Sequence, residues 1–200
     1  LDRGIKPKDV LYLLPTESLK EYCRENEISY RGKNIANAIL DSYRETQNFF
    51  VENYTLIANN DINGLKNNGL EIKGDEVGVK FEEVTKTIFN AMGFNIDEKI
   101  RKELNTRKDK ADIVISLDND EIMIGECKAS KEPYSKFSTI SRQLRSYVNS
   151  YEKQGKRVRT SLIIAPAFTD DFIAECDVFT DFQITLIDAE VLYNIYQAFK

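Results

Sequence analysis

The feature that most constrains the fold is an alternating apolar and polar run at 111–128, with the sequence ADIVISLDNDEIMIGECK. Alternation with a period of two predicts two β-strands, each with one buried face. Asp-Asn-Asp at 118–120 predicts a turn between them, because Asn tolerates the left-handed conformation that three-residue hairpin loops require. In that register Asp112 faces Glu126, whereas a two-residue turn would place these carboxylates on opposite faces of the sheet.

The second strand ends in Glu126, Cys127 and Lys128. Alternate residues of a strand point to the same face, so Glu126 and Lys128 share a face and Cys127 points away from it. With the three-residue turn, Asp112 joins them at the open end of the hairpin. Unpaired carboxylates so close together repel each other and raise the pKa of one of them.

A hard divalent cation removes this repulsion, because Mg²⁺ prefers a few carboxylate oxygens together with water and substrate phosphate. The main-chain carbonyl of Cys127 offers a further oxygen ligand. The ammonium of Lys128, next to a metal-bound water, is placed to orient or deprotonate that water. Metal and lysine together would stabilise charge that develops at a phosphoryl centre. The pattern therefore predicts phosphodiester hydrolysis.

Composition narrows the chemistry further, because the chain contains no histidine. This absence excludes Ser-His-Asp and Cys-His hydrolases, and also nucleases that depend on a histidine. The three cysteines, at 23, 127 and 176, are odd in number and far apart, which predicts neither a disulfide framework nor a zinc site. A reducing, cytoplasmic location fits this pattern. No run of about eighteen apolar residues occurs, so no membrane span is predicted.

The net charge of −5 argues against a broad nucleic-acid-binding surface but allows a local basic groove. Two clusters of basic residues occur, KIRKELNTRKDK at 99–110 and KQGKRVR at 153–159. The first supplies three candidate DNA-binding side chains, Arg107, Lys108 and Lys110. An ordinary solvated surface explains either cluster equally well.

Hydrophobic periodicity predicts an α/β domain with a mixed sheet and helices on both faces. After the hairpin, a wholly apolar segment at 159–168 is typical of a central strand. The expected order over 76–200 is α-β-β-α-β-α-β-α. Its helices are expected at 77–94, 138–155, 170–179 and 189–199, and its last strand at 183–188.

The first part of the chain has a different pattern. Residues 1–58 are expected to form a helical module, with a helix start at Pro15-Thr16 and an extended break at ISYRGK. Residues 59–75 are rich in Asn, Gly and Asp, which predicts a linker. The second domain then spans 76–200.

Asp112, followed after thirteen residues by Glu126-Cys127-Lys128, resembles the PD-(D/E)XK nuclease superfamily of restriction and repair endonucleases. The resemblance covers roughly 76–200, and the order of the later elements is similar to cleavage domains of Type IIS restriction enzymes. It implies a further strand near 95–101, making a restriction endonuclease-like core. Ala111 stands where the family's usual motif has proline, a departure that the family tolerates.

The resemblance also implies roles for individual residues. Asp112, Glu126 and the Cys127 carbonyl would hold Mg²⁺, with Mn²⁺ as the expected substitute, and Lys128 would act on the attacking water. In the segment KFEEVTKTIFNAMGF, Glu82 would complete the metal site, with Glu83 as its competitor. Two further residues match the family's Gln-x-x-x-Tyr element, Gln143 and Tyr147, for which helix packing is an equally good explanation.

The segment LPTESLKEYCRENEISYRGKNIANAILDSY resembles the helix, extended loop and helix of SAP-type nucleic-acid-binding motifs. Backbone amides at the start of its second helix, with Arg31 and Lys33, would form a phosphate-binding edge. A helical packing unit without a binding role is the alternative.

Together these patterns predict a Mg²⁺-dependent DNA endonuclease, either a Type II or IIS restriction endonuclease or its cleavage portion. Its partner would be double-stranded DNA, and cutting both strands would require a homodimer, a partner subunit or a second encounter. Two alternatives stay open: a DNA repair or junction-resolving nuclease of the same fold, and a non-catalytic DNA-binding subunit.

Overall fold

The computed structural model describes residues 10–45, 47–103 and 110–199. The chain divides into two compact units, Leu1–Glu52 and Asn53–Lys200. Within the described ranges, none of the helices has the length and apolar character needed to cross a membrane.

The first unit contains α2 (Thr16–Glu25), α3 (Ile35–Glu45) and α4 (Gln47–Glu52). Its small core comprises Leu19 and Cys23 from α2 and Ile39 from α3, with Leu11, Ile28 and Ile35 packed around them. The chain reverses between the two helices at Gly32, whose φ of 73° suits a residue without a Cβ. The helix start at Pro15-Thr16 and the break before α3 are as predicted.

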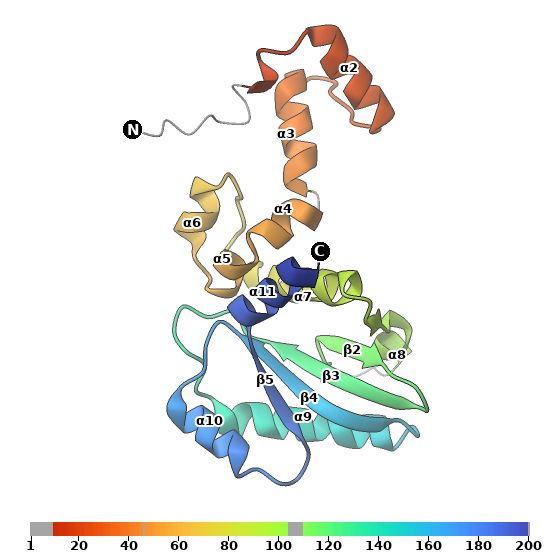
Figure 1. Cartoon of the computed structure of the whole chain (residues 1–200), viewed down its shortest axis with the longest axis vertical. Coiled ribbons are helices and arrows are strands. Elements are labelled where there is room, and N and C mark those ends of the chain that lie inside the picture. The colour runs from red at the N-terminus through yellow and green to blue at the C-terminus, as the bar shows by residue number, and fades with distance from the viewer. Residues whose placement is uncertain (1–9, 46, 104–109, 200) are drawn as a thin grey trace. The chain divides into compact units, whose positions relative to one another are not determined.

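The second unit is built on a five-stranded mixed sheet, which confirms the predicted fold class (Figure 1). Its strands lie in chain order: β1 (Asn95–Ile96), β2 (Ile113–Ser116), β3 (Glu121–Cys127), β4 (Arg157–Ala165) and β5 (Ile184–Asp188). The first three strands are antiparallel, whereas β4 is parallel to β3 and β5 is parallel to β4. The sheet is therefore an antiparallel half joined to a parallel half at β3.

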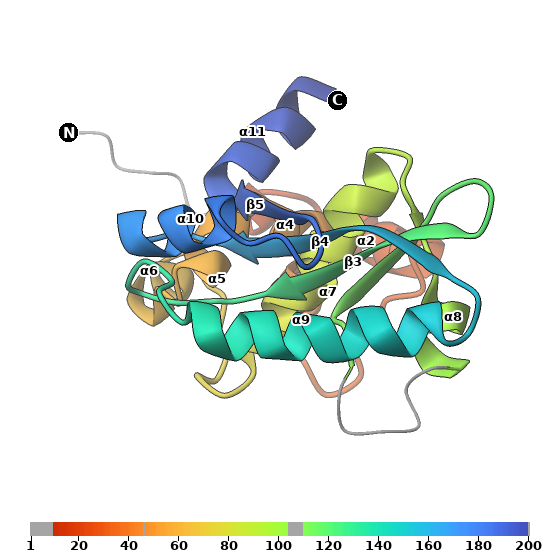
Figure 2. The same cartoon turned by 90° about the horizontal axis from the view of Figure 1, so that it is seen from below.

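Helices cover both faces of this sheet, with α7 (Val77–Ala91) and α9 (Phe137–Glu152) on opposite sides (Figures 1 and 2). The remaining helices are α5 (Tyr54–Ala58), α6 (Ile62–Asn67), α8 (Glu98–Glu103), α10 (Asp170–Asp177) and α11 (Ala189–Phe199). One extensive core cluster joins α9 to the sheet, with Ile140 and Leu144 packed on Ile122 and Ile124. The predicted helices at 77–94, 138–155, 170–179 and 189–199 are all present. The last has the predicted bounds, whereas the other three end two or three residues earlier than predicted and α9 begins one residue earlier.

The predicted register of the hairpin is confirmed, because Ile113 pairs with Gly125 and Ser116 pairs with Ile122. The turn is closed by the Leu117 amide, which donates to the carbonyl of Glu121 at 2.8 Å. Asn119 takes the expected left-handed conformation with φ of 59°, and Asp120 takes it as well with φ of 60°.

Two regions differ from the predicted organisation. The predicted linker at 59–75 contains α6, and its Leu65 and Leu70 are buried. Residues 53–58, expected in the first module, belong to the second unit as α5. Burial of Leu65 and Leu70 stabilises the folded form of residues 59–75, although Asn, Gly and Asp dominate the composition of this segment. The extra strand predicted near 95–101 has only two residues, β1, and α8 follows directly.

Substitution of Asn119 tests the left-handed conformation of the turn that sets the register of the hairpin. We expect Asn119→Val to reduce the free energy of unfolding by about 1–2 kcal/mol, because a β-branched residue is strained in the left-handed region. Asn119→Gly, which accepts this conformation, is the control and should retain the wild-type stability. Urea denaturation measures both variants. Equal stability of all three proteins would contradict the left-handed turn.

Candidate active site

The alternation of β3 places its functional residues on two different faces of the sheet. Ile122 and Ile124 point into the core beneath α9, so Glu126, two residues further on, points to the same side. Cys127 is turned to the other side, where its thiol interacts with Thr85 of α7. The predicted separation of Glu126 from the Cys127 side chain is therefore present.

Glu126 is the most unusual side chain of the sheet, because a carboxylate is only 1% exposed there. Its Oε2 accepts a hydrogen bond of 2.6 Å from Nζ of Lys128, so the two residues share a face as predicted. Its other oxygen, Oε1, is buried and has no hydrogen-bond partner among the described residues. A buried polar atom normally has a partner, so Oε1 is an oxygen that could serve as a ligand for a cation.

Asp112 is fixed directly beside this pair. Its Oδ2 accepts a hydrogen bond of 2.8 Å from the backbone amide of Cys127. The amide of the next residue, Lys128, points the other way and donates to Ile164 of β4. Since the N–H and C=O of one strand residue point to the same neighbour, the carbonyl of Cys127 also points to the side of Asp112. That direction suits the predicted main-chain ligand.

Glu82 reaches the same region from α7, and its competitor Glu83 does not. Glu82 is half-buried and close enough to Asp112 for the two charges to repel. Glu83 is exposed and forms an ion pair of 2.6 Å with Lys80. One turn after Glu82, Lys86 lies 3.5 Å from Glu98 of α8 and brings a positive charge near the carboxylates. The structure thus brings four predicted residues together: Glu82, Asp112, Glu126 and Lys128.

Burial and mutual repulsion change the protonation of these carboxyl groups. Burial, with the charge of Asp112 added to it, raises the pKa of Glu126 to about 7. The same two causes raise the pKa of Glu82 to about 7. Burial also raises the pKa of Asp112, against the opposing effects of the Cys127 amide and Lys128. Near neutral pH the group therefore retains protons that a bound cation would displace.

The pKa of Lys128 is raised as well, but for a different reason. Burial alone lowers the pKa of its ammonium, but the charge and hydrogen bond of Glu126, together with Asp112, raise it overall. The lysine consequently stays protonated while its bond to Glu126 persists. In this state it stabilises negative charge and donates hydrogen bonds, but it has no free electron pair with which to deprotonate water.

The donor set fits a hard divalent cation. Oxygen atoms are offered by Glu126 Oε1, by the Asp112 carboxylate and by the Cys127 carbonyl, and Mg²⁺ typically takes one or two carboxylates with water and phosphate. Within the described ranges, no three His, Cys, Asp or Glu side chains converge as a metal-holding group. Glu82 would therefore act at the edge of the site, through water or after a movement of α7.

Gln143 and Tyr147 lie where α9 faces Glu126. The amide of Gln143 donates to the Tyr147 hydroxyl at 2.5 Å. That hydroxyl is near enough to lower the pKa of Glu126, and burial together with Glu126 raises the pKa of Tyr147. The pair thus contributes to the polar surroundings of the carboxylate, in addition to packing α9 on the sheet.

The predicted DNA-binding residues are dispersed. Arg31 is exposed beside a small depression of about 310 Å³ that Ile28, Ser29 and Tyr30 also line. Lys33 forms an ion pair of 3.2 Å with Asp41. In α3, the Asn34 side chain already accepts from the Ala36 and Asn37 amides, which leaves fewer donors for a phosphate.

In the second unit, Lys110 is exposed, whereas Arg107 and Lys108 lie outside the described residues. The other basic cluster, at 153–159, is used structurally. Its Lys156 pairs with Asp120 at 2.6 Å, and Arg157 pairs with Glu121 at 3.1 Å. These bonds hold the start of β4 against the hairpin turn, as the solvated-surface interpretation expects.

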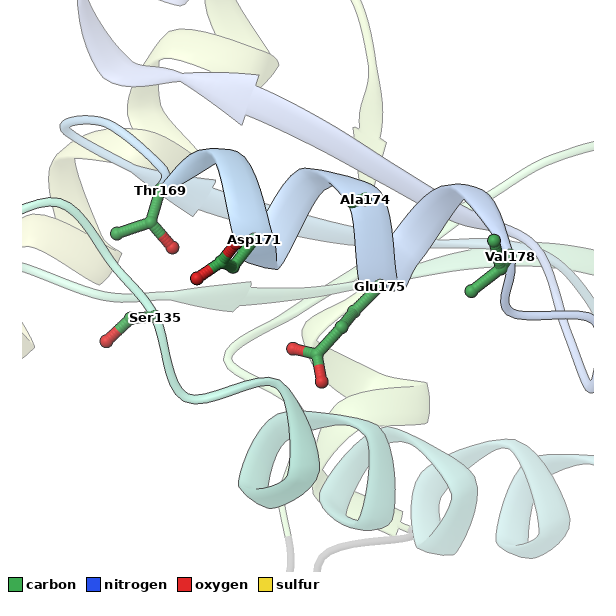
Figure 3. A pocket seen from close by; sticks show the side chains of 6 residues that line it. All are labelled: Ser135, Thr169, Asp171, Ala174, Glu175 and Val178. Carbon is green, nitrogen blue, oxygen red and sulfur yellow. The ribbon is translucent and has the colours of Figure 1, made fainter.

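A depression of about 740 Å³ does not coincide with the carboxylates. Figure 3 shows that Asp171 and Glu175 of α10, and Thr169 just before this helix, line it together with Ser135. It is wide and acidic, which is unfavourable for a phosphate backbone. The carboxylates and Lys128 lie elsewhere, at the open end of the β2–β3 hairpin.

Tyr134, which no sequence pattern indicated, lies near Lys128 in the structure. Its backbone is held between Ala167 and Thr169, and its ring packs edge-on against Phe172 at 5.3 Å. Burial raises the pKa of its hydroxyl, while the charge of Lys128 opposes this. Only the return of the 167–169 segment beside residue 134 brings this phenol to the site.

The carboxyl cluster predicts a pH dependence of stability. Because the folded-state pKa of Glu126 and Glu82 lies above that of an unfolded glutamate, the folded state binds more protons between these values. We therefore expect the metal-free protein to lose stability as the pH rises from about 5 to about 8. Thermal denaturation across this range measures the slope.

Glu126→Gln should flatten this slope, and Glu83→Gln, on the exposed side of α7, should leave it unchanged. Millimolar Mg²⁺ should restore stability at the higher pH in the wild type. A metal-free protein that becomes more stable over this pH range would contradict the arrangement.

Comparison with known proteins found no matching family model, no similar curated protein and no similar solved structure. The chemistry of this chain is therefore interpreted from the geometry of its own residues.

Proposed function

We propose that this protein is a Mg²⁺-dependent DNA endonuclease that hydrolyses phosphodiester bonds. The supporting observation is the buried Glu126 carboxylate, which has one oxygen bound to Lys128 and the other without a hydrogen-bond partner among the described residues. A charged group in this setting is unfavourable unless another ligand completes it. The carboxylate of Asp112 lies beside Glu126, and two neighbouring carboxylates repel each other unless a positive charge lies between them. The expected ligand is therefore a cation.

The roles of the residues follow from their atoms. Asp112, Glu126 and the Cys127 carbonyl would hold the metal, and Glu82 would hold one of its waters. The metal, when bound, supplies Lewis-acid stabilisation of the phosphate and a more acidic water. The Cys127 amide fixes Asp112, so this ligand is oriented before substrate arrives. The absence of histidine requires that oxygen ligands and a lysine perform all of this chemistry.

Lys128 is assigned to charge stabilisation rather than proton abstraction. Its raised pKa keeps it as an ammonium that lies 2.6 Å from Glu126 Oε2. From there it can donate a hydrogen bond to a phosphoryl oxygen or to the attacking water, and charge developing in the transition state strengthens that bond. The proton of the water would pass to solvent or to a substrate oxygen.

DNA is the proposed substrate on the basis of the resemblance of Asp112 and Glu126-Cys127-Lys128 to PD-(D/E)XK nucleases. A restriction enzyme or its cleavage portion is the form proposed first. A junction-resolving or repair enzyme would use the same residues, and cleavage of linear duplex, flap and four-way-junction DNA in parallel would distinguish them. A purely DNA-binding subunit does not explain why two carboxylates are buried together.

The site makes a direct prediction about cleavage. We expect the wild type to cut plasmid DNA with Mg²⁺ or Mn²⁺. Asp112→Asn and Lys128→Met should each reduce the rate by at least about 10²-fold, because each removes a group that acts on the developing charge. Gel electrophoresis of supercoiled plasmid measures the rates, and circular dichroism verifies that the variants are folded.

Glu83→Gln is the matched control, since this carboxylate lies on the same helix and faces solvent. It should cut like the wild type. A folded Asp112→Asn variant with full activity would show that the assigned residues are not the site.

A further inference from the structure

We infer that a buried hydroxyl pair, Tyr54 on α5 and Thr85 on α7, is a positioning device for the metal ligands. The two residues lie behind β3, on the face opposite Glu126, and touch neither substrate nor metal. This inference rests on the proposed function, because it assigns the pair to the geometry of that site.

The pair is a directional chain of hydrogen bonds. The Tyr54 hydroxyl lies 2.9 Å from Oγ1 of Thr85, and Thr85 Oγ1 donates to the carbonyl of Phe81 at 2.7 Å. A threonine hydroxyl has one proton, so Tyr54 must be the donor to Thr85. Both side chains have 0% exposure, which makes these bonds strong and their loss unfavourable.

These hydrogen bonds lie between the two segments that supply the predicted ligands, α7 and the end of β3. Phe81, whose carbonyl accepts the last bond, directly precedes Glu82. On the sheet side, the Thr85 hydroxyl is near enough to the buried Cys127 thiol to oppose the rise in its pKa that burial causes, and Cys127 lies between Glu126 and Lys128. The Thr85 hydroxyl is therefore bonded to Tyr54 of α5 and to the backbone of α7, and it lies next to the end of β3.

A second contact ties α5 to the segment after Lys128. The amide of Ser130 donates to the carbonyl of Ala58 at 2.9 Å, at the opposite end of α5 from Tyr54. The Tyr54 ring also stacks on Phe81, with centroids 5.2 Å apart. This five-residue helix thus holds α7 at its first residue and the chain beyond β3 at its last.

Apolar contacts hold α7 on the sheet, whereas the hydroxyl pair of Tyr54 and Thr85 fixes the exact position of α7. Phe81, Val84 and Ile88 would keep α7 on the sheet by apolar contacts without the hydroxyl pair. Such contacts tolerate small shifts, whereas hydrogen bonds fix the distance and angle. Productive metal geometry requires ligands placed within about 0.5 Å. Loss of the pair should therefore weaken metal binding more than it lowers stability.

Metal titration of the full chain without DNA tests this inference. Tyr54→Phe removes one hydroxyl and keeps the stacked ring, and the double variant Tyr54→Phe/Thr85→Val removes both without leaving a buried donor. We expect each to weaken Mn²⁺ binding about 10-fold by calorimetry, in line with other groups that orient metal ligands. Thr85→Ser, which retains the hydroxyl, should bind like the wild type.

The matched control is Thr185→Val, which breaks a hydroxyl pair of the same 2.9 Å length between Thr160 and Thr185 on β4 and β5. We expect it to lower the melting temperature without changing Mn²⁺ affinity. Equal weakening by this control, or wild-type affinity in both Tyr54 variants, would overturn the positioning role and leave the nuclease proposal intact. A wild type that neither binds Mn²⁺ nor cuts DNA would overturn both.

Discussion

The second unit depends on one electrostatic constraint, the placement of the buried Glu126 carboxyl group beside the partly buried carboxyl group of Asp112. Asp112 immediately precedes β2, opposite the end of β3, and its charge makes Glu126 harder to ionise. In isolation such a pair would favour a different register or a more open sheet. The surrounding contacts resist this, since Lys128 holds one oxygen of Glu126 and the Cys127 amide holds Asp112.

The apolar structure around the pair explains why it remains in place. Ile113, Ile122, Ile124 and Ile163 are almost completely buried, so a shift of register by one residue would turn the isoleucines of one strand to the other face of the sheet and disrupt their packing. Hydrophobic burial of this kind is stronger than the repulsion of one carboxyl pair that can share a proton. The apolar core thus holds Asp112 and Glu126 side by side.

Several of these features could be predicted because they depend on local rules. Alternation and the Asp-Asn-Asp turn fixed the register of β2 and β3, and with it the pairing of Asp112 with Glu126. The choice of Glu82 over Glu83 agrees with helical spacing, because Phe81 and Thr85 of the buried face flank Glu82 and leave Glu83 toward solvent.

The parts that were not predicted depend on contacts between distant segments. A composition rich in Asn and Gly concealed α6, whose burial rests on Leu65 and Leu70. The two-residue β1 is too short to have a periodic pattern of its own. Tyr54 and Tyr134 reach the site through α5 and through the return of residues 167–169, and no spacing along the chain indicates either.

The backward orientation of Cys127 has a consequence for redox chemistry. Burial raises the pKa of its thiol well above the ordinary value, so the reactive thiolate is scarce. Oxidation and alkylation both begin from the thiolate, and both would add bulk directly behind the ligand-bearing strand. A cysteine between two site residues would normally make a site sensitive to oxidants, but here its orientation protects it. Cys176, which is less buried, is the more accessible of the two thiols.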